Sequence, residues 1–199
     1  MQKHRIQYMA KVAILSALAA IIMFLECPLP FVPSFYKLDF SEIVVLISGF
    51  ALGPLAAVLT ELIKTLCHLP FTITAGVGEL AAFVMGVSFA LPAAIIYKRK
   101  KSFKNAVIGM VLGTICLVVI GAVMNYFVMI PAFIWLADFP EAAIIADGTE
   151  ANGNITGLGS LIIYGTIPFN LVKGVFCSFL TALVYKRVSP ILHKNFGKK

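Results

Sequence analysis

The chain has 199 residues, of which 60% are hydrophobic and only 13% are charged. Soluble domains have a smaller apolar share and about 25% charged residues, so this composition excludes an ordinary water-soluble fold and indicates a membrane protein. The formal net charge of +7 does not indicate a nucleic-acid partner, because the basic residues gather beside apolar runs, at residues 3–11, 98–104 and 186–199. This is the positive-inside pattern of cytoplasmic loops.

The first apolar run covers residues 8–25 and overlaps the first basic cluster. No small-residue cleavage site of a signal peptide precedes the next apolar run, so we expect a retained membrane helix. Its small side chains Ala10, Ala13 and Ala17 share a face, where another membrane helix can approach closely. On spacing alone, packing within the chain is the favoured role of this face.

Residues 27–40 and 131–158 form the two long connections, both expected on the extracytoplasmic side. Prolines at positions 28, 30 and 33 stiffen the first connection, and its aromatic residues are Phe31, Phe35, Tyr36 and Phe40. Two interpretations remain open for it: a lid over a pocket, or an aromatic belt at the membrane interface. The second connection is predicted to be a loop, without an assigned role.

The number of helices follows from the charges. About 20 apolar residues cross a bilayer, and five apolar runs are present. An even number of crossings must separate the first two basic clusters, so the run at 41–67 contains two helices, broken at the GFALGP segment of residues 49–54. The sequence therefore predicts one all-α membrane domain over residues 1–199. Both termini are expected in the cytoplasm, and the six helices, two of them short, are expected at about 8–25, 41–50, 53–67, 77–97, 104–130 and 160–187.

Several polar residues interrupt these runs. A charge at mid-bilayer costs roughly 2.5–3.5 kcal/mol, so such residues usually face the interior of the helix bundle. Glu61 and Lys64 lie three apart on one helical face, which favours a structural ion pair. Glu79 opens the fourth helix, where an acid suits the positive helix end, so structural and ligand-binding roles are about equally open. Asn125 either binds a ligand or joins helices.

Asn170 and Lys173 form the sharpest polar pair. They lie three apart, just after Pro168, near the extracytoplasmic end of the last helix and beneath the proposed lid. Gly174 beside them is expected to leave room for a flat group. A ligand-binding role is favoured. The alternatives are that Lys173 reaches outward to the membrane surface or pairs with Glu79.

Familiar catalytic motifs are absent from the sequence. It contains no GxxxxGK[ST] phosphate loop, no HExxH and no GxSxG. Its four cysteines and three histidines lack metal-site spacing, so neither a metal nor a cofactor is expected. A transporter built on this chain would therefore take its energy from an ion gradient or from separate subunits, and a partner subunit is the favoured source. A small intramembrane enzyme and a self-sufficient carrier are the rival classes.

Five short segments carry a resemblance that covers nearly the whole chain. They are KLDFSEI at 37–43, GFALGP at 49–54, ELIK at 61–64, GVGELA at 76–81 and NLVKG at 170–174. The chain resembles the substrate-binding S components of energy-coupling factor (ECF) vitamin transporters, and most closely their riboflavin-specific branch.

The resemblance implies a fold and partners. It implies six helices with cytoplasmic termini, in the plasma membrane of a prokaryote, and a pocket covered by the connection after the first helix. It also implies association with a transmembrane coupling subunit and two ATPases. Ala13 and Ala17 match the family's contact surface for the coupling subunit, although the third position of that pattern is Ile21 here.

The resemblance also implies a site. Asn125, Asn170 and Lys173 are expected to contact the polar edge of the isoalloxazine ring, where carbonyl acceptors alternate with an N–H donor. The weaker candidates for ligand contact are Gly78, Glu79, Leu38, Asp39 and Phe40. Riboflavin is thus expected as the transported ligand rather than as a cofactor. FMN, thiamin, pantothenate and biotin are the alternatives.

Overall fold

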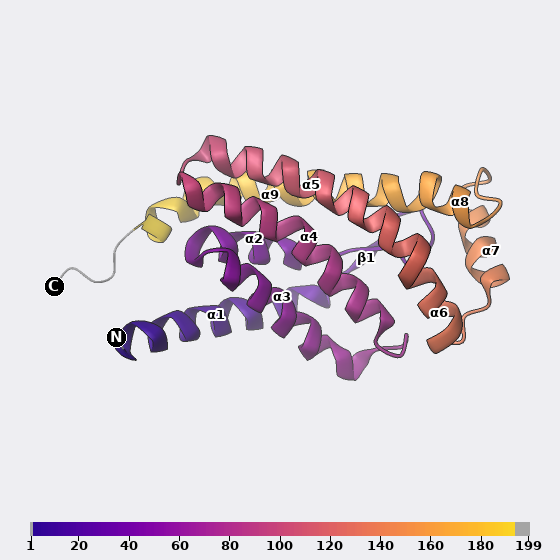
Figure 1. Ribbon diagram of the computed structural model, residues 1–199, viewed down its shortest axis with the longest axis horizontal. Coiled ribbons are helices and arrows are strands. Elements are labelled where there is room, and N and C mark those ends of the chain that lie inside the picture. Colours follow the sequence, from indigo (N-terminus) through magenta and orange to yellow (C-terminus); the bar gives the residue numbers. More distant parts are fainter. Residues whose placement is uncertain (1, 194–199) are drawn as a thin grey trace.

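The computed structural model describes residues 2–193, which are mainly helical. Helices α5 and α6 are joined by the π-helical segment η2 into one continuous helix, and α8 and α9 are joined in the same way by η3 (Figure 1). The elements in chain order are α1 (Gln2–Met23), β1 (Cys27–Pro28), β2 (Lys37–Leu38), α2 (Ser41–Leu52), α3 (Pro54–His68), the 3₁₀ turn η1 (Leu69–Phe71), α4 (Val77–Arg99), α5 (Phe103–Met124), η2 (Asn125–Met129), α6 (Ile130–Leu136), α7 (Glu141–Ala151), α8 (Leu158–Leu161), η3 (Ile162–Thr166) and α9 (Ile167–His193).

Four of the described helices have the length and hydropathy needed to cross a bilayer: His4–Met23, Val77–Arg99, Phe103–Leu136 and Leu158–Tyr185. Helix α2 is apolar but has only 12 residues, and α3 has 15. The outer surface of the long helices is apolar. On α5, for example, Val111, Ile115 and Val119 are 56%, 54% and 57% exposed. Such an extended apolar surface marks contact with lipid.

Helices α2 and α3 form a short hairpin inside the bundle, in contact with α1, α4 and α9. The chain turns at Gly53, whose φ of 103° suits glycine and strains other residues. Pro54 follows as the first residue of α3, where its missing N–H costs nothing. The sequence placed this break within residues 49–54.

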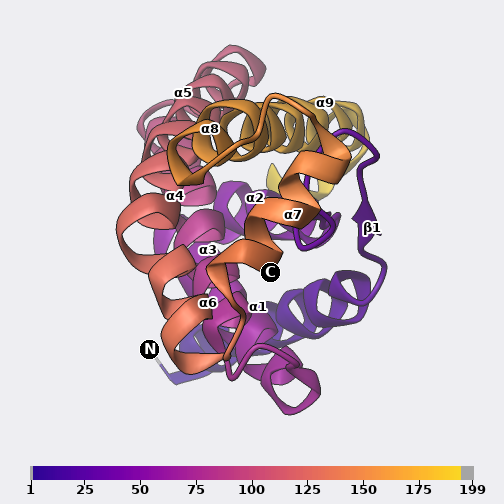
Figure 2. The ribbon, with the colours of Figure 1, turned by 90° about the vertical axis from the view of Figure 1, so that its right-hand side faces the viewer.

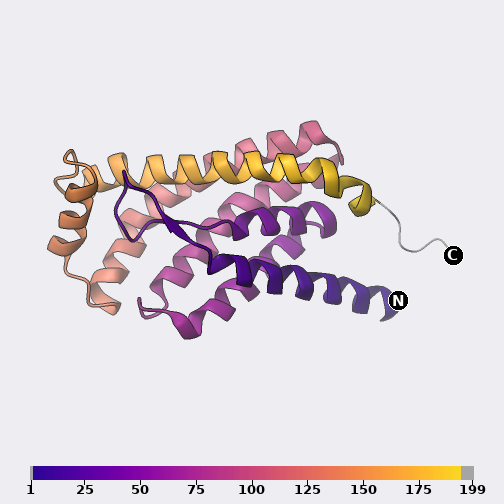
Figure 3. The ribbon, with the colours of Figure 1, turned by 180° about the vertical axis from the view of Figure 1, so that it is seen from behind.

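The two ends of the molecule differ in charge. Figures 1 and 3 place the start of α1, the α4–α5 turn and the described end of α9 at one end of the bundle. Segments of all three basic clusters therefore lie at that end, while residues 194–199 of the third cluster lie outside the described residues. The α3–α4 connection and α7 lie at the opposite end. Both described ends of the chain thus lie at one end of the bundle, while the six crossings and the cytoplasmic side of the termini stay predictions.

The first connection is more ordered than expected. Strands β1 and β2 pair antiparallel, with Cys27 opposite Leu38, and an ion pair joins Glu26 to Lys37 beside them. The ribbon carries residues 29–36 across the bundle to the side of α9 (Figure 3). Val32 and Tyr36 are buried there and pack with Phe169 of α9. The connection therefore covers the helices instead of only lining an interface.

The second connection was predicted to be a loop, and this prediction was wrong for most of residues 131–158. The preceding helix continues to Leu136, and α7 adds three turns across the end of the bundle (Figure 2). Glu141 stabilises the first turn of α7 as an acid at a positive helix end. Ile144 of α7 packs with Ile155 and Leu161. Burial of these apolar side chains explains why the segment is helical.

Candidate functional site

Two buried asparagines meet at Gly121. The amide nitrogen of Asn125 donates to the carbonyl oxygen of Gly121 over 2.8 Å. The amide of Asn170 lies against the same residue, so closely that a methyl group on Gly121 would overlap its nitrogen. Asn125 and Asn170 are only 7% and 3% exposed. Within residues 2–193 the Asn170 side chain has no hydrogen-bond partner, so the donors and the acceptor of its amide are available to another molecule.

The backbone beside these asparagines is irregular in the two continuous helices, α5–α6 and α8–α9. Segment η2 begins at Asn125 and η3 ends at Thr166, and the two π-helical segments are in contact. Each is followed by a proline, Pro131 and Pro168, at the second residue after the segment. A proline ring crowds the carbonyl of the preceding turn, and a wider turn relieves the crowding. Single π turns within α-helices are frequent at functional sites.

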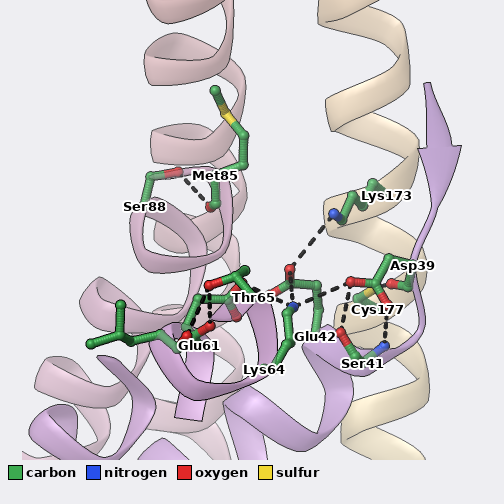
Figure 4. A network of polar contacts seen from close by, with 11 residues as sticks. Asp39, Ser41, Glu42, Glu61, Lys64, Thr65, Met85, Ser88, Lys173 and Cys177 are labelled. Atoms are coloured by element: carbon green, nitrogen blue, oxygen red, sulfur yellow. Dashed lines mark hydrogen bonds and ion pairs between the residues drawn. The ribbon is translucent and has the colours of Figure 1, made fainter. Parts of the chain in front are cut away.

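Lys173 lies one turn beyond Asn170 and faces a cluster of buried charges (Figure 4). Its ammonium nitrogen is 3.6 Å from Oε1 of Glu42. Lys173 is 7% exposed, so it does not reach outward to the membrane surface. The alternative pairing of Lys173 with Glu79 was wrong, because Nδ1 of His68 contacts Glu79 Oε1 at 3.1 Å instead.

Lys64 is the centre of this charge cluster, which comprises Asp39, Glu42, Glu61, Lys64 and Lys173. Its ammonium lies 3.2 Å from Asp39, 3.0 Å from Glu42 and 2.9 Å from Glu61. The ion pair that the sequence predicted between Glu61 and Lys64 is therefore present. The two contacts with Asp39 and Glu42 join the first connection and α2 to α3.

The charge cluster holds three carboxylates and two ammonium groups. One oxygen of Glu42 and both oxygens of Glu61 lack a hydrogen-bond partner among the described residues, although one oxygen of Glu61 faces Lys64. Burial raises the pKa of the Asp39 carboxyl, but Lys64, Lys173 and hydrogen bonds from Ser41 outweigh it and lower that pKa to about 2. Asp39 therefore stays ionised at neutral pH.

Gly78 and Glu79 belong to a separate polar group at the start of α4. Glu79 Oε2 accepts a hydrogen bond from Thr72 at 2.7 Å, in addition to its contact with His68. The Gly78 N–H donates to Thr74 over 3.0 Å. Among residues 2–193, no hydrogen bond or ion pair joins Gly78 or Glu79 to the two asparagines.

The remaining candidates from the first connection have different surroundings. Leu38 is 5% exposed and Asp39 6%. The half-buried Phe40 packs edge-on against Phe176 of α9, with ring centroids 5.9 Å apart. Gly174 was expected to leave room for a flat group, but Thr114 of α5 fills that space.

Three residues of the site were not singled out as binding residues from the sequence. The Tyr36 hydroxyl lies 2.6 Å from Thr166 Oγ1 and 3.3 Å from Asn125 Oδ1, and its ring stacks on Phe169 with centroids 5.1 Å apart. Glu42 links both lysines of the charge cluster. The polar types of Thr166 and Glu42 within apolar runs were the available signals. Tyr36 carried none, because other aromatic residues surround it in the sequence.

The alanine face of α1 points out of the bundle. Ala13 and Ala17 are exposed, together with Ile14, Leu18 and Ile21, while Ala19 is buried. Packing within the chain, which spacing alone favoured, is therefore not the role of Ala13 and Ala17 in the described part of the protein.

Comparisons with known proteins identify a family and relatives that are similar to this chain. The family model described as "ECF transporter, substrate-specific component" matches residues 7–185. The riboflavin transporter RibU of Staphylococcus aureus is 33% identical over 92% of this chain and 90% of its own length. The riboflavin transporter FmnP of Bacillus subtilis is 28% identical over 96% of both chains.

A solved structure agrees with these matches. The S component of a bacterial ECF transporter superposes with a TM-score of 0.74 at 29% identity, over 96% of this chain and 99% of that one. The predicted resemblance is confirmed: the chain belongs to the family of substrate-specific components of ECF transporters.

Proposed function

We propose that this chain is the high-affinity riboflavin-binding subunit of an ATP-driven vitamin importer. The proposal rests first on Asn170, a buried amide for which the described chain supplies no partner. A ring edge with alternating carbonyl and N–H groups satisfies such an amide, and the neighbouring amide of Asn125 extends the same polar surface. Similarity to riboflavin transporters of two bacteria supports this choice of ligand.

The acidic residues at the site favour the neutral vitamin over FMN. FMN carries its phosphate at the end of the ribityl chain, away from the ring edge that Lys173 would contact, and Lys64 already faces three carboxylates. Two of the weaker candidates for ligand contact, Asp39 and Glu79, are acidic, and none of the candidates is an arginine that could clamp a phosphate. Riboflavin brings no such charge.

The remaining parts of the proposal concern orientation and partners. Six helices with the basic end in the cytoplasm would place the first connection outside the cell, where it acts as the lid of the site. The exposed alanine face of α1, Ala13 and Ala17, would receive the transmembrane coupling subunit. Two ATPases bound to that subunit would supply the energy, in the plasma membrane of a prokaryote.

The first experiment identifies the bound molecule. The detergent-purified protein should be yellow, and mass spectrometry of an extract should find riboflavin in about equal amount to protein. Asn170→Ala removes the unpartnered amide and should weaken binding about 10- to 100-fold, so most of the flavin should be lost on washing.

Asn105→Ala is the matched control, because Asn105 lies in the first turn of α5, whereas Asn125 directly follows the last residue of that helix. This variant should keep its flavin. A colourless wild-type protein whose extract contains no flavin would contradict the proposal, and another vitamin in the extract would redirect it.

A further inference from the structure

Tyr36 links the first connection, residues 27–40, to the two continuous helices α5–α6 and α8–α9. Its side chain is 9% exposed and stacks on Phe169, with an angle of 17° between the ring planes. Its hydroxyl lies between Asn125 and Thr166, which belong to the two π-helical segments. One side chain from the connection thus bridges both irregular turns of the site.

The amide of Asn125 has a fixed orientation. Its nitrogen donates to the carbonyl oxygen of Gly121 at 2.8 Å, and its oxygen accepts from the Tyr36 hydroxyl at 3.3 Å. Rotating the amide by half a turn would place its oxygen against the Gly121 carbonyl, where two acceptors repel. The amide therefore keeps one N–H and one oxygen lone pair free for another partner, each in a fixed position.

The Tyr36 hydroxyl is itself held in place. Thr166 lies 2.6 Å away, and when Thr166 donates to the phenol oxygen, the phenol proton is left for Asn125. Burial raises the pKa of Tyr36 to about 12, although the hydrogen bond with Thr166 acts in the opposite direction. The phenol therefore keeps its proton at neutral pH and remains a donor.

We propose that Tyr36 is a positioning residue: from the first connection it fixes the amide of Asn125, so that this amide presents a donor beside an acceptor to the ring edge of the ligand. The proposal rests on the proposed function, since it takes riboflavin as the ligand. It adds that recognition of the ligand's ring edge depends on the first connection. The Tyr36 hydroxyl reaches Asn125 only when the Tyr36 ring lies against Phe169. Tyr36 acts through Asn125 and not by contact with the vitamin.

A double-mutant cycle tests this dependence. The riboflavin dissociation constant is measured by quenching of flavin fluorescence for wild type, Tyr36→Phe, Asn125→Ala and the double variant. Tyr36→Phe keeps the stacked ring and removes only the hydroxyl, so we expect about tenfold weaker binding. In the Asn125→Ala background the same substitution should change binding less than about twofold. Equal losses in both backgrounds would overturn the proposal, because Tyr36 would then act independently of Asn125.

Two further variants sharpen the result. Thr166→Val removes the partner of the phenol and should weaken binding in wild type, with little added loss in the Tyr36→Phe background. Tyr126→Phe removes a hydroxyl next to Asn125 in sequence from a side chain that is 44% exposed, and it should bind like wild type. Tighter binding by Tyr36→Phe would also overturn the proposal, since it would mean that riboflavin displaces the phenol. Wild-type protein that binds no riboflavin would instead refute the proposed function, and this is seen before any variant is made.

Discussion

Lys64 is fully buried, and its position depends on the carboxylates around it. Removing one partner from a buried ion pair typically costs about 3–5 kcal/mol, because the other charges lose their compensation. Lys64→Met leaves three carboxylates facing only Lys173. We expect its melting temperature in detergent to fall on the order of 10 °C below that of wild type.

Glu61→Gln is the matched control within the charge cluster. It replaces a carboxylate whose one ion pair among the described residues is with Lys64 by a neutral group of the same shape, and it leaves two carboxylates with two ammonium groups. Its melting temperature should stay within about 4 °C of wild type. A loss as large as that of Lys64→Met would show that the negative charge of Glu61 is needed.

At the residue scale, the sequence predicted contacts within one helix better than contacts between segments. The ion pair between Glu61 and Lys64 follows from their spacing, because residues three apart share a helical face. The contacts of Lys64 with Asp39 and Glu42 depend on how the α2–α3 hairpin folds back, and no spacing encodes that. Tyr36 illustrates the same limit, since its partner Asn125 is 89 positions away.

At the scale of elements, α5 matters because its backbone at Gly121 contacts both asparagines of the site. Gly121→Ala adds a methyl group where the amide nitrogen of Asn170 lies. Overpacking of this kind costs about 1–3 kcal/mol or moves the neighbouring side chain. We expect bound flavin in the purified protein to fall about tenfold or more.

Gly159→Ala provides the comparison, because a methyl group on that α8 residue meets no atom within 4 Å. This variant should retain wild-type flavin content and thermal stability. If Gly121→Ala also retained its flavin, Asn170 would not need its observed position for binding.

Apolar runs predicted the elements of the bundle well, because length and hydropathy decide which segments cross a membrane. The break near Gly53 was visible from glycine and proline. The two π-helical turns were not predicted, although Pro131 and Pro168 were a usable signal. Helix α7 was missed because its alanine, glycine and acidic residues resemble a loop until their apolar partners are known.

At the scale of the whole molecule, the ligand site and the exposed alanine face of α1 involve different parts of the bundle. Ala17→Trp adds a large ring to the exposed alanine face without touching the asparagines. We expect flavin content to stay at the wild-type level. Co-purification with the coupling subunit and ATP-dependent riboflavin uptake in vesicles should fall at least about tenfold, since tight helix contact needs small residues.

Val119→Trp is the control, because it adds the same ring to an exposed position on α5, a different helix. It should assemble and transport like wild type. Equal assembly by Ala17→Trp would move the contact for the coupling subunit away from this part of α1.

The resemblance supplied what neither charge nor hydropathy contains, namely the class of ligand and the partners. Parity of the basic clusters predicted that the chain ends share one side, and the start of α1 and the described end of α9 lie together (Figure 1). The pairing of the first connection with α9 was outside the reach of composition, because it depends on the packing of Val32 and Tyr36 around Phe169.

One contact between the two long connections has a consequence for access. Asp147 of α7 accepts hydrogen bonds from the backbone N–H of Ser34 at 2.9 Å and from its hydroxyl at 3.0 Å, at the water-exposed end of the molecule. Water competes for such exposed hydrogen bonds, so we expect this contact between the two connections to break at lower cost than the ion pairs of the buried charge cluster. The first connection should therefore separate from α7 before the charge cluster is disturbed.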